Sequence, residues 1–188
     1  MNAPRAPEEA DREVDTEDDA VRITGATLTG LAVEPGARKV RLRDSVLVDA
    51  DLSNVHARFA ALRRVELRRC RLVGLELVEG EVEDVLFSEG TLMLGSLGHA
   101  RLHRVRFEAM NLREASFVGA DLRHVEFVDC ALEGADFRDA RCTKVVIRGS
   151  TLAGVVGITS LKGVAMPADD LVASATTLAA ALGIELES

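Results

Sequence analysis

Residues 112–137 read LREASFVGADLRHVEFVDCALEGADF, and in this stretch a leucine or phenylalanine returns at every fifth position. The same phase runs without a slip from Val40 to Gly154. Counted from Leu42, the series has 23 members, of which 19 are Leu or Phe. A fixed short period is the signature of a solenoid. The series therefore predicts a solenoid whose core is filled by one large residue per repeat.

The residue two places before each member of the series is Ala, Val, Ser, Cys or Gly in 21 of the 23 cases. A period of five fits neither an α-helix nor a simple strand. It does fit a coil that turns a corner every five residues, with the large and the small residue pointing inward. The other three residues of each repeat are rich in Arg, Glu, Asp, Thr, Asn and Gly, so we expect them to face water.

These repeats resemble the motif Ala-[Asp/Asn]-Leu-x-x of the pentapeptide-repeat proteins. Good matches are Ala50-Asp51-Leu52-Ser53-Asn54, Ala120-Asp121-Leu122-Arg123-His124 and Ala135-Asp136-Phe137-Arg138-Asp139. The chain departs from the motif mostly at the Asp/Asn position, which alters the surface and leaves the core rule intact. The resemblance implies an all-β solenoid, namely a right-handed quadrilateral parallel β-helix with four repeats per coil.

Because four repeats make one coil, each residue should stack on the residue four repeats further along the chain. Phe87, Phe107 and Phe127 are spaced in this way, as are Phe117 and Phe137. Columns of matched side-chain volume are how a close-packed interior is filled. We expect about six coils, and with strands roughly 4.8 Å apart the solenoid should be on the order of 30 Å long.

The two ends of the chain differ from the repeats. Residues 1–20 hold eight acidic residues and two arginines, a composition that predicts a disordered acidic tail. Residues 21–158 are the predicted β-helix, in which the centres Ile23, Leu28 and Val33 precede a turn at Glu34-Pro35-Gly36-Ala37 and are out of phase with Leu42. There is no signal-peptide pattern and no apolar stretch long enough to span a membrane, so we expect a cytoplasmic protein.

Residues 159–188 are predicted to form a C-terminal cap that is also a dimerisation element. Apolar residues follow helical spacing over 167–182, with Pro167 in the first turn, Gly183 at the stop and a short strand after it. A similar C-terminal helix and strand make the twofold dimer in the quinolone-resistance branch of the family, so the resemblance implies a homodimer; a cap on a monomer is the alternative. The residues of this dimer cap are Leu171, Val172, Ala175, Leu178, Ala179 and Leu182.

The sequence offers no catalytic chemistry. The four histidines fall in outward positions. Two of them, His103 and His124, share a face, but the sequence offers no third metal ligand beside them. The three cysteines fall in inward positions as small core residues. Phosphate-binding and nucleophile motifs are absent. We therefore expect no enzyme activity, no cofactor and no metal.

Function is then expected on the outer faces. The side that carries Leu42 shows nine basic residues against five acidic ones, and we call these nine the arginine face: Arg41, Arg43, Arg63, Arg64, Arg101, Arg104, Arg123, Arg141 and Lys144. The side that carries Leu47 shows six acidic residues, the acidic face: Asp49, Glu66, Glu89, Glu108, Glu126 and Asp129. A third side shows Val73, Met93 and Leu94 outward, a candidate apolar patch. The alternative for all of these charges is ordinary solubility.

Three binding functions are compatible with these faces. The family resemblance implies a DNA mimic that binds DNA gyrase or topoisomerase IV and protects it from inhibitors. The second hypothesis is a scaffold that docks another protein through one face. The third is an anionic partner on the arginine face, although direct binding of nucleic acid is disfavoured, since no aromatic residues alternate with the arginines and acidic residues interrupt them.

Overall fold

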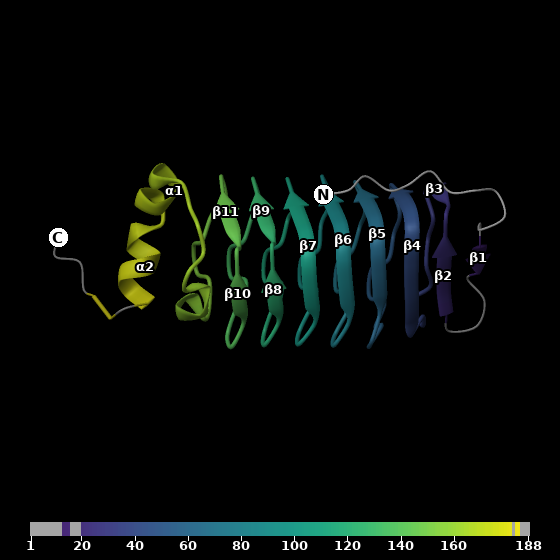
Figure 1. Cartoon of the computed structure of the whole chain (residues 1–188), viewed down its shortest axis with the longest axis horizontal. Coiled ribbons are helices and arrows are strands. Elements are labelled where there is room, and N and C mark those ends of the chain that lie inside the picture. Colours follow the sequence, from purple (N-terminus) through teal and green to yellow (C-terminus); the bar gives the residue numbers. More distant parts are fainter. Residues whose placement is uncertain (1–12, 16–19, 182, 185–188) are drawn as a thin grey trace.

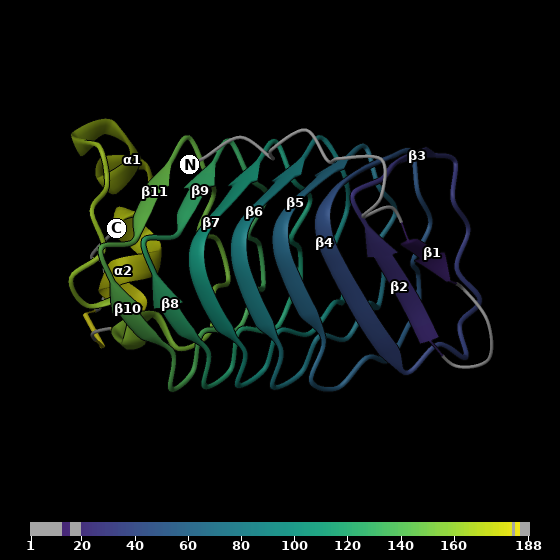
Figure 2. The same ribbon diagram turned by 45° about the vertical axis from the view of Figure 1, so that its right-hand side comes forward.

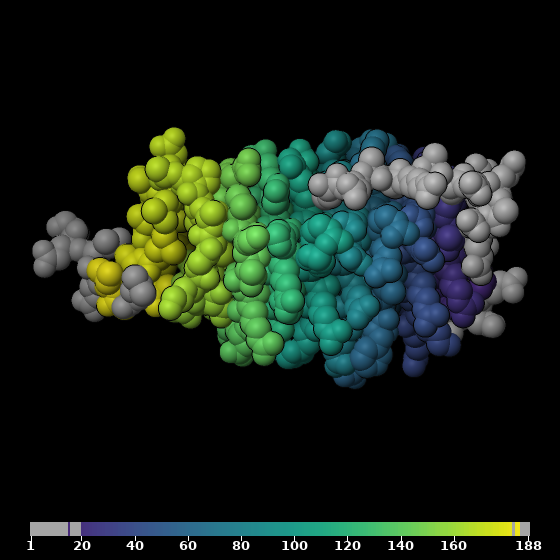
Figure 3. All heavy atoms as spheres, in the orientation of Figure 1, coloured from purple at the N-terminus to yellow at the C-terminus, as the bar shows by residue number. Residues whose placement is uncertain are grey.

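The computed structural model describes residues 13–15, 20–181 and 183–184, and it is a parallel β-solenoid of about six coils (Figure 1). Successive coils stack in a register of four repeats, so that Leu42 pairs with Leu62 and Phe87 with Phe107. The space-filling view shows one continuous body from the first coils to the C-terminal segment (Figure 3). The expected coil of four repeats is confirmed.

The strands follow the repeats, and the helices follow the last coil. The strands are β1 (Glu13–Asp15), β2 (Ala20–Thr24), β3 (Thr27–Thr29), β4 (Lys39–Val48), β5 (Ala61–Arg68), β6 (Glu81–Ser88), β7 (Arg101–Glu108), β8 (Asp121–Arg123), β9 (Glu126–Val128), β10 (Arg141–Thr143) and β11 (Val146–Arg148). The helices are the 3-10 helix η2 (Ile158–Leu161), α1 (Ala168–Ala173) and α2 (Ala175–Ala181).

Each coil pairs with the next at four places, which gives the solenoid four sides. The named strands form the ladders on the sides of the arginine face and the acidic face. Isolated bridges form the other two ladders, for example Asp51↔Arg71 and His56↔Glu76. Figure 2 shows β4 to β7 as curved strands that turn from the first of these sides to the next. Outward side chains on one side therefore lie in rows along the axis, about 4.8 Å apart.

The core consists of the predicted columns. Phe87, Phe107 and Phe127 are fully buried and stack with ring centroids 4.9 and 5.1 Å apart. Phe117 and Phe137 form a second stack at 4.8 Å, and the two stacks meet edge to face. Offset and edge-to-face contacts are the favoured arrangements of aromatic rings. The spacing of four repeats therefore yields directly stacked rings, as expected.

Every repeat turns its corner through a left-handed residue two places after the centre. All 23 of these positions have positive φ: 18 hold a non-glycine residue, such as Phe59 and Leu94, and five hold glycine. Positive φ costs an L-residue roughly 1–2 kcal/mol, and Asn, Asp and Gly tolerate it best. This position is occupied by Asp, Asn or Gly in many of the repeats, a signal that the pattern of large and small residues did not use.

The first coil is one position shorter than the others. Val21 pairs with Val40 and Ile23 with Leu42, whereas Leu42 pairs with Leu62 in the next coil. The turn at Glu34–Ala37, closed by a hydrogen bond from the amide of Ala37 to the carbonyl of Glu34, replaces the fourth side. This explains the phase break seen in the sequence.

The acidic tail expected over residues 1–20 contains one strand. β1 pairs antiparallel with β2, with Glu13 opposite Thr24 and Asp15 opposite Arg22. Over this strand the structure therefore differs from the expected disorder, because the open edge of β2 offers unpaired backbone groups that another strand can satisfy. The rest of the predicted tail, apart from Ala20 at the start of β2, lies outside the described residues.

The C-terminal cap contains two short helices where the sequence predicted one. The amide of Ser174 still donates to the carbonyl of Asp170 at 3.0 Å, but ψ at Ser174 is 0°, so the helix breaks there. Serine is a weak helix former, which accounts for the position of the break. Pro167 precedes α1 as its N-cap and is not part of its first turn. The strand expected after Gly183 falls mostly outside the described residues.

The carboxylate of Asp170 ties α1 to the last coil. Its Oδ2 accepts a hydrogen bond of 2.6 Å from the amide of Gly149. In earlier coils the equivalent amide donates to a carbonyl of the next coil, as Asp129 does to Arg148. Asp170 thus supplies, for the amide of Gly149, the acceptor that a further coil would have supplied.

Candidate binding surfaces

The arginine face is a ladder of ion pairs between neighbouring coils. Arg64 donates through Nε and Nη2 to both carboxylate oxygens of Asp44, and Arg104 holds Asp84 in the same bidentate way. Arg104 also reaches Glu83 at 2.7 Å. Arg63–Glu83 and Arg101–Glu81 also join neighbouring coils, whereas Arg43–Asp44 and Arg123–Asp121 lie within one coil. His103 lies 3.9 Å from Glu83.

These pairs lower the pKa of the acidic partners. The hydrogen bonds from Arg64 hold the pKa of Asp44 below its ordinary value, and those from Arg104 do the same for Asp84. The pKa of Glu83 is lowered by Arg104 first and by Arg63 second. Asp44, Glu83 and Asp84 are therefore charged at neutral pH, and they neutralise much of the positive charge on this face.

Three members of the arginine face have no ion pair among the residues that the structure describes. Arg41 lies toward the N-terminal end of the face, and Arg141 and Lys144 lie toward its C-terminal end. All three are exposed. The free positive charge is thus concentrated at the two ends of the face, with paired charges between them.

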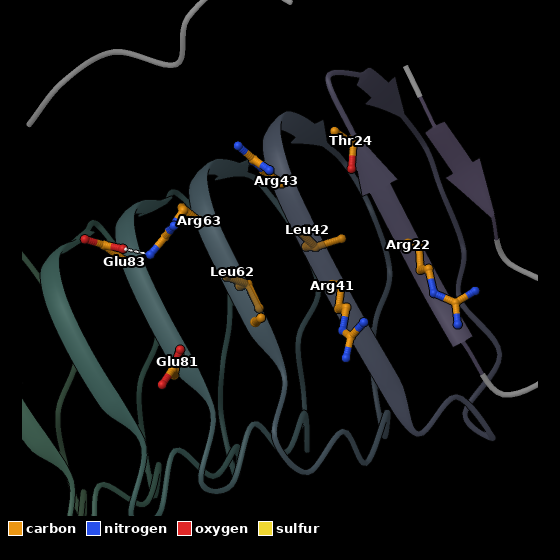
Figure 4. A pocket seen from close by; sticks show the side chains of 10 residues that line it. Arg22, Thr24, Arg41, Leu42, Arg43, Leu62, Arg63, Glu81 and Glu83 are labelled. Atoms are coloured by element: carbon orange, nitrogen blue, oxygen red, sulfur yellow. Dashed lines mark ion pairs between the residues drawn. The ribbon is translucent and has the colours of Figure 1, made fainter. Parts of the chain in front are cut away.

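A groove of about 450 Å³ lies at the N-terminal end of the arginine face (Figure 4). It runs between two rows of outward residues on β2, β4, β5 and β6. One row is Arg22, Arg41, Ala61 and Glu81, and the other is Thr24, Arg43, Arg63 and Glu83. Leu42 and Leu62 form the floor, as Figure 4 shows. Sequence reasoning found three of these four arginines but not Arg22 or the groove itself.

Ala61 is the reason for the groove. The equivalent position of the neighbouring coils holds Arg41, Glu81 and Arg101, all with long side chains. A methyl group at residue 61 leaves a gap between Arg41 and Glu81, which opens the groove to the backbone of β5. A small outward residue in a row of large ones is the signal that could have located it.

The acidic face is also largely paired. Arg69 holds both oxygens of Asp49, Arg68 pairs with Glu66, and Arg106 pairs with Glu108 and Glu126. Glu89 and Asp129 are exposed and have no ion pair in the described part of the chain. The six acidic residues therefore lie on one side of the solenoid, and among the described residues only these two of the six make no ion pair.

Apolar side chains are exposed at two corners of the solenoid. Leu94 is 54% exposed, while Val73 and Met93 beside it are half-buried. Phe59, which sequence reasoning did not single out, is 65% exposed and lies beneath the guanidinium of Arg58. Both Phe59 and Leu94 occupy the left-handed corner position, which turns a side chain outward whatever its chemistry.

The residues predicted for a dimer cap lie on α1 and α2 with different exposure. Leu171 and Val172 are 50% and 74% exposed, and Ala175 is exposed. Leu178 and Ala179 are half-buried, and the side chain of Leu182 lies outside the described residues. The cap thus presents apolar side chains outward at its first helix.

The histidines and cysteines lie as the repeat pattern predicts. His103 and His124 lie in neighbouring coils and meet edge to face with ring centroids 5.7 Å apart, and no group of three potential metal ligands occurs among the described residues. Cys70 and Cys130 are buried, which raises the pKa of both thiols. Cys142 is half-buried near the C-terminal end of the solenoid, and burial raises its pKa as well. No helix in the described ranges is long and apolar enough to cross a membrane.

Comparison with family models identifies the repeat. The model described as pentapeptide repeats matches eight copies, over residues 38–78 and 100–139. The coil between these ranges keeps the same register, since β6 pairs with both β5 and β7. A search of the curated proteins finds no match.

Solved structures with the same repeat are similar to this chain at low identity. HetL, a pentapeptide-repeat protein involved in heterocyst differentiation regulation from the cyanobacterium Nostoc sp. strain PCC 7120, is 22% identical, with a TM-score of 0.26 over 79% of this chain and 88% of that chain. Full-length QnrB1, a plasmid-mediated fluoroquinolone resistance protein, is 15% identical, with a TM-score of 0.25 over 86% of this chain and 99% of that chain. At these values the likeness carries no functional information about this chain.

Proposed function

Because this chain is a pentapeptide-repeat protein, we propose that it is a non-catalytic binding protein whose outer faces dock a partner protein. The observation that carries the proposal is the separation of apolar side chains inside the solenoid from charged side chains on its outer faces. The inward positions form one apolar core, and the charged side chains lie outside in rows that neutralise one another. Rows of fixed charge on a stiff body suit recognition of a matching surface.

We propose DNA gyrase or topoisomerase IV as the partner, which the protein would bind as a mimic of duplex DNA and protect from inhibitors. The resemblance to the quinolone-resistance branch of the family motivates this choice. On the acidic face, Glu89 and Asp129 carry the proposal, because their exposed carboxylates make no ion pair among the described residues. This partner would place the protein in the cytoplasm, where these enzymes act.

The proposed mimic is a homodimer joined through the C-terminal cap. Leu171 and Val172 expose apolar surface on α1, beyond the last coil. Exposed apolar side chains at the end of a solenoid favour pairing with an equal surface on a second copy. Such a dimer would double the length of the charged body.

Pull-down from a bacterial lysate tests the partner, with and without competing duplex DNA. The proposal expects recovery of gyrase or topoisomerase IV that duplex DNA reduces. With purified gyrase, the protein should restore supercoiling in the presence of a fluoroquinolone, and a double variant Glu89→Arg/Asp129→Arg should do so less well. Glu114→Arg, a charge reversal at an exposed corner of another face with the same backbone conformation, is the control. Equal protection by both variants would exclude the acidic face as the contact.

A further inference from the structure

We propose that the groove at Ala61 is a binding site for a short acidic peptide segment of a partner protein. The inference rests on the proposed protein-binding function, but it concerns the arginine face, whereas the topoisomerase proposal concerns the acidic one. The groove holds four arginines, Arg22, Arg41, Arg43 and Arg63, against Glu81 and Glu83. Its lining is therefore net positive, and the ligand it selects is an anion.

The arginines of the groove are available to a ligand to different degrees. Arg41 is exposed and has no ion pair within the described residues. Arg43 makes a single pair of 3.2 Å with Asp44, and its side chain is 63% exposed. Arg63 pairs with Glu83 and is 56% exposed. Exposed single pairs contribute little stability, so an incoming carboxylate can exchange with the internal one at small cost.

The size of the groove suits a peptide in extended conformation. It crosses β2, β4, β5 and β6, which are three strand spacings, or about 14 Å. An extended peptide rises about 3.4 Å per residue, so about four residues fill this length. Carboxylates on such a peptide meet guanidinium groups from both rows, and bidentate arginine–carboxylate pairs give the contact its geometry.

A contact of this type already occurs at the edge of the groove. β1 is an extended acidic segment, and its Asp15 accepts a hydrogen bond of 2.7 Å from Nη1 of Arg22. The carboxylate of an extended segment therefore reaches one of the lining arginines. The groove continues from that point toward Arg41, Arg43 and Arg63.

Nucleic acid fits the groove less well than an acidic peptide. The lining has no aromatic side chain on which a base could stack. Glu81 and Glu83 close the end over β6, where a continuing phosphate backbone would meet negative charge. A short peptide that fills the groove ends at these two glutamates, whereas a polynucleotide would have to continue past them.

Fluorescence anisotropy with the full chain tests the site directly. The probe is a labelled tetraglutamate peptide with blocked ends, measured at low salt and again at physiological salt. We expect binding that weakens as salt rises, since the Debye length falls to about 8 Å. Arg41→Ala should weaken binding about fivefold, the upper range for an exposed charge pair. Arg148→Ala, which removes an exposed arginine from another face, should leave binding unchanged.

A second pair of variants separates the groove from general charge. Ala61→Glu puts a carboxylate between Arg41 and Arg63 and should weaken the peptide at least about tenfold, by occupying the site as well as by charge. Ala131→Glu is the matched control, because Ala131 has the same place in its repeat and is also half-buried. An equal loss of peptide affinity in both variants, or no loss in Ala61→Glu, would contradict the proposal that the peptide binds in the groove.

A single-stranded oligonucleotide of equal charge is the competing probe. If it binds more tightly than the peptide and is lost in Ala61→Glu, the ligand class proposed here is wrong. These measurements use purified protein and a defined probe, so their failure leaves the topoisomerase test unaffected. Failure to recover a topoisomerase likewise says nothing about peptide binding in the groove.

Discussion

Phe107 occupies the middle of a stack of three rings. It is fully buried, with Phe87 and Phe127 on either side at 4.9 and 5.1 Å. Phe107→Ala should leave a cavity between two rings and lower the free energy of unfolding by roughly 3–5 kcal/mol. Thermal or urea unfolding measures the loss. Arg106→Ala, on the neighbouring outward residue, should cost about 1 kcal/mol or less. Equal losses in the two variants would contradict the assignment of inward and outward positions.

Gly157 ends the last regular coil in a conformation that only glycine adopts there without strain. Its φ is 70°, and an added Cβ would lie 2.4 Å from the backbone nitrogen of Arg138. Gly157→Ala should therefore destabilise the C-terminal end by roughly 1–3 kcal/mol, since a backbone atom cannot move aside. Gly36→Ala is the control, because no atom lies within 4 Å of its added Cβ. Proteolysis near the C-terminus together with a melting curve would report the difference, and the idea fails if both variants behave alike.

At the level of the strands, bidentate ion pairs link coils across β4–β7. Arg104 on β7 holds Asp84 on β6, and this contact lowers the pKa of Asp84 from its ordinary 3.8. A carboxyl whose pKa falls on folding stabilises the fold above its unfolded-state pKa, and the contribution disappears as pH falls through the folded-state pKa. The pair therefore strengthens the solenoid at neutral pH and loses its effect below about pH 4.

Asp84→Asn tests this dependence on pH. The variant should be less stable than the original chain at pH 7 by roughly 1 kcal/mol, because the pair is partly open to water. The difference in the free energy of unfolding between the two chains should decrease as the pH falls below 3.8, the ordinary pKa of the carboxyl. Asp139→Asn, at an exposed corner with the same backbone conformation, serves as control. A gap that stays constant from pH 7 to pH 2.5 would mean that charge is not the cause.

At the scale of the whole molecule, the C-terminal cap exposes an apolar side chain on α1. Val172 is 74% exposed on α1, so a change there should not disturb the folded chain itself. If the proposed dimer forms through this cap, Val172→Asp should yield monomers, since a buried unpaired carboxylate is expensive. Thr176→Asp, on an exposed residue of α2, adds the same charge as a control.

Light scattering at micromolar concentration measures the molar mass of the original chain and of both variants, and so tells monomer from dimer. Monomers in the Val172→Asp variant with a retained melting curve would support the cap as the interface. An unchanged dimer would move the interface to another surface, and an original chain that is already monomeric would end the proposal. Leu178 is a less informative site than Val172, because it is half-buried within its own chain.

The sequence by itself determined the repeat, the inward residues and the number of coils. The period of five indicates which two residues of each repeat face the core. A coil of four repeats then determines which side chains stack, as with Phe107 and Phe127. The same rule placed each charged residue on its side of the solenoid. It could not decide which charges are neutralised, because pairing depends on the reach of each side chain, as Arg104 shows by holding both Glu83 and Asp84.

Only the tertiary structure decided the groove and the form of the cap. Arg22 belongs to the coil before the phase break, and the turn at Glu34–Ala37 sets the shortened step that places it beside Arg41. The groove also depends on the short side chain of Ala61. This residue opens a gap only because the stacked coils place it between the long side chains of Arg41 and Glu81. The contact of the cap with the last coil likewise appears only in the assembled structure, where Asp170 accepts a hydrogen bond from the amide of Gly149. Such features arise from contacts between coils, and a local pattern does not contain them.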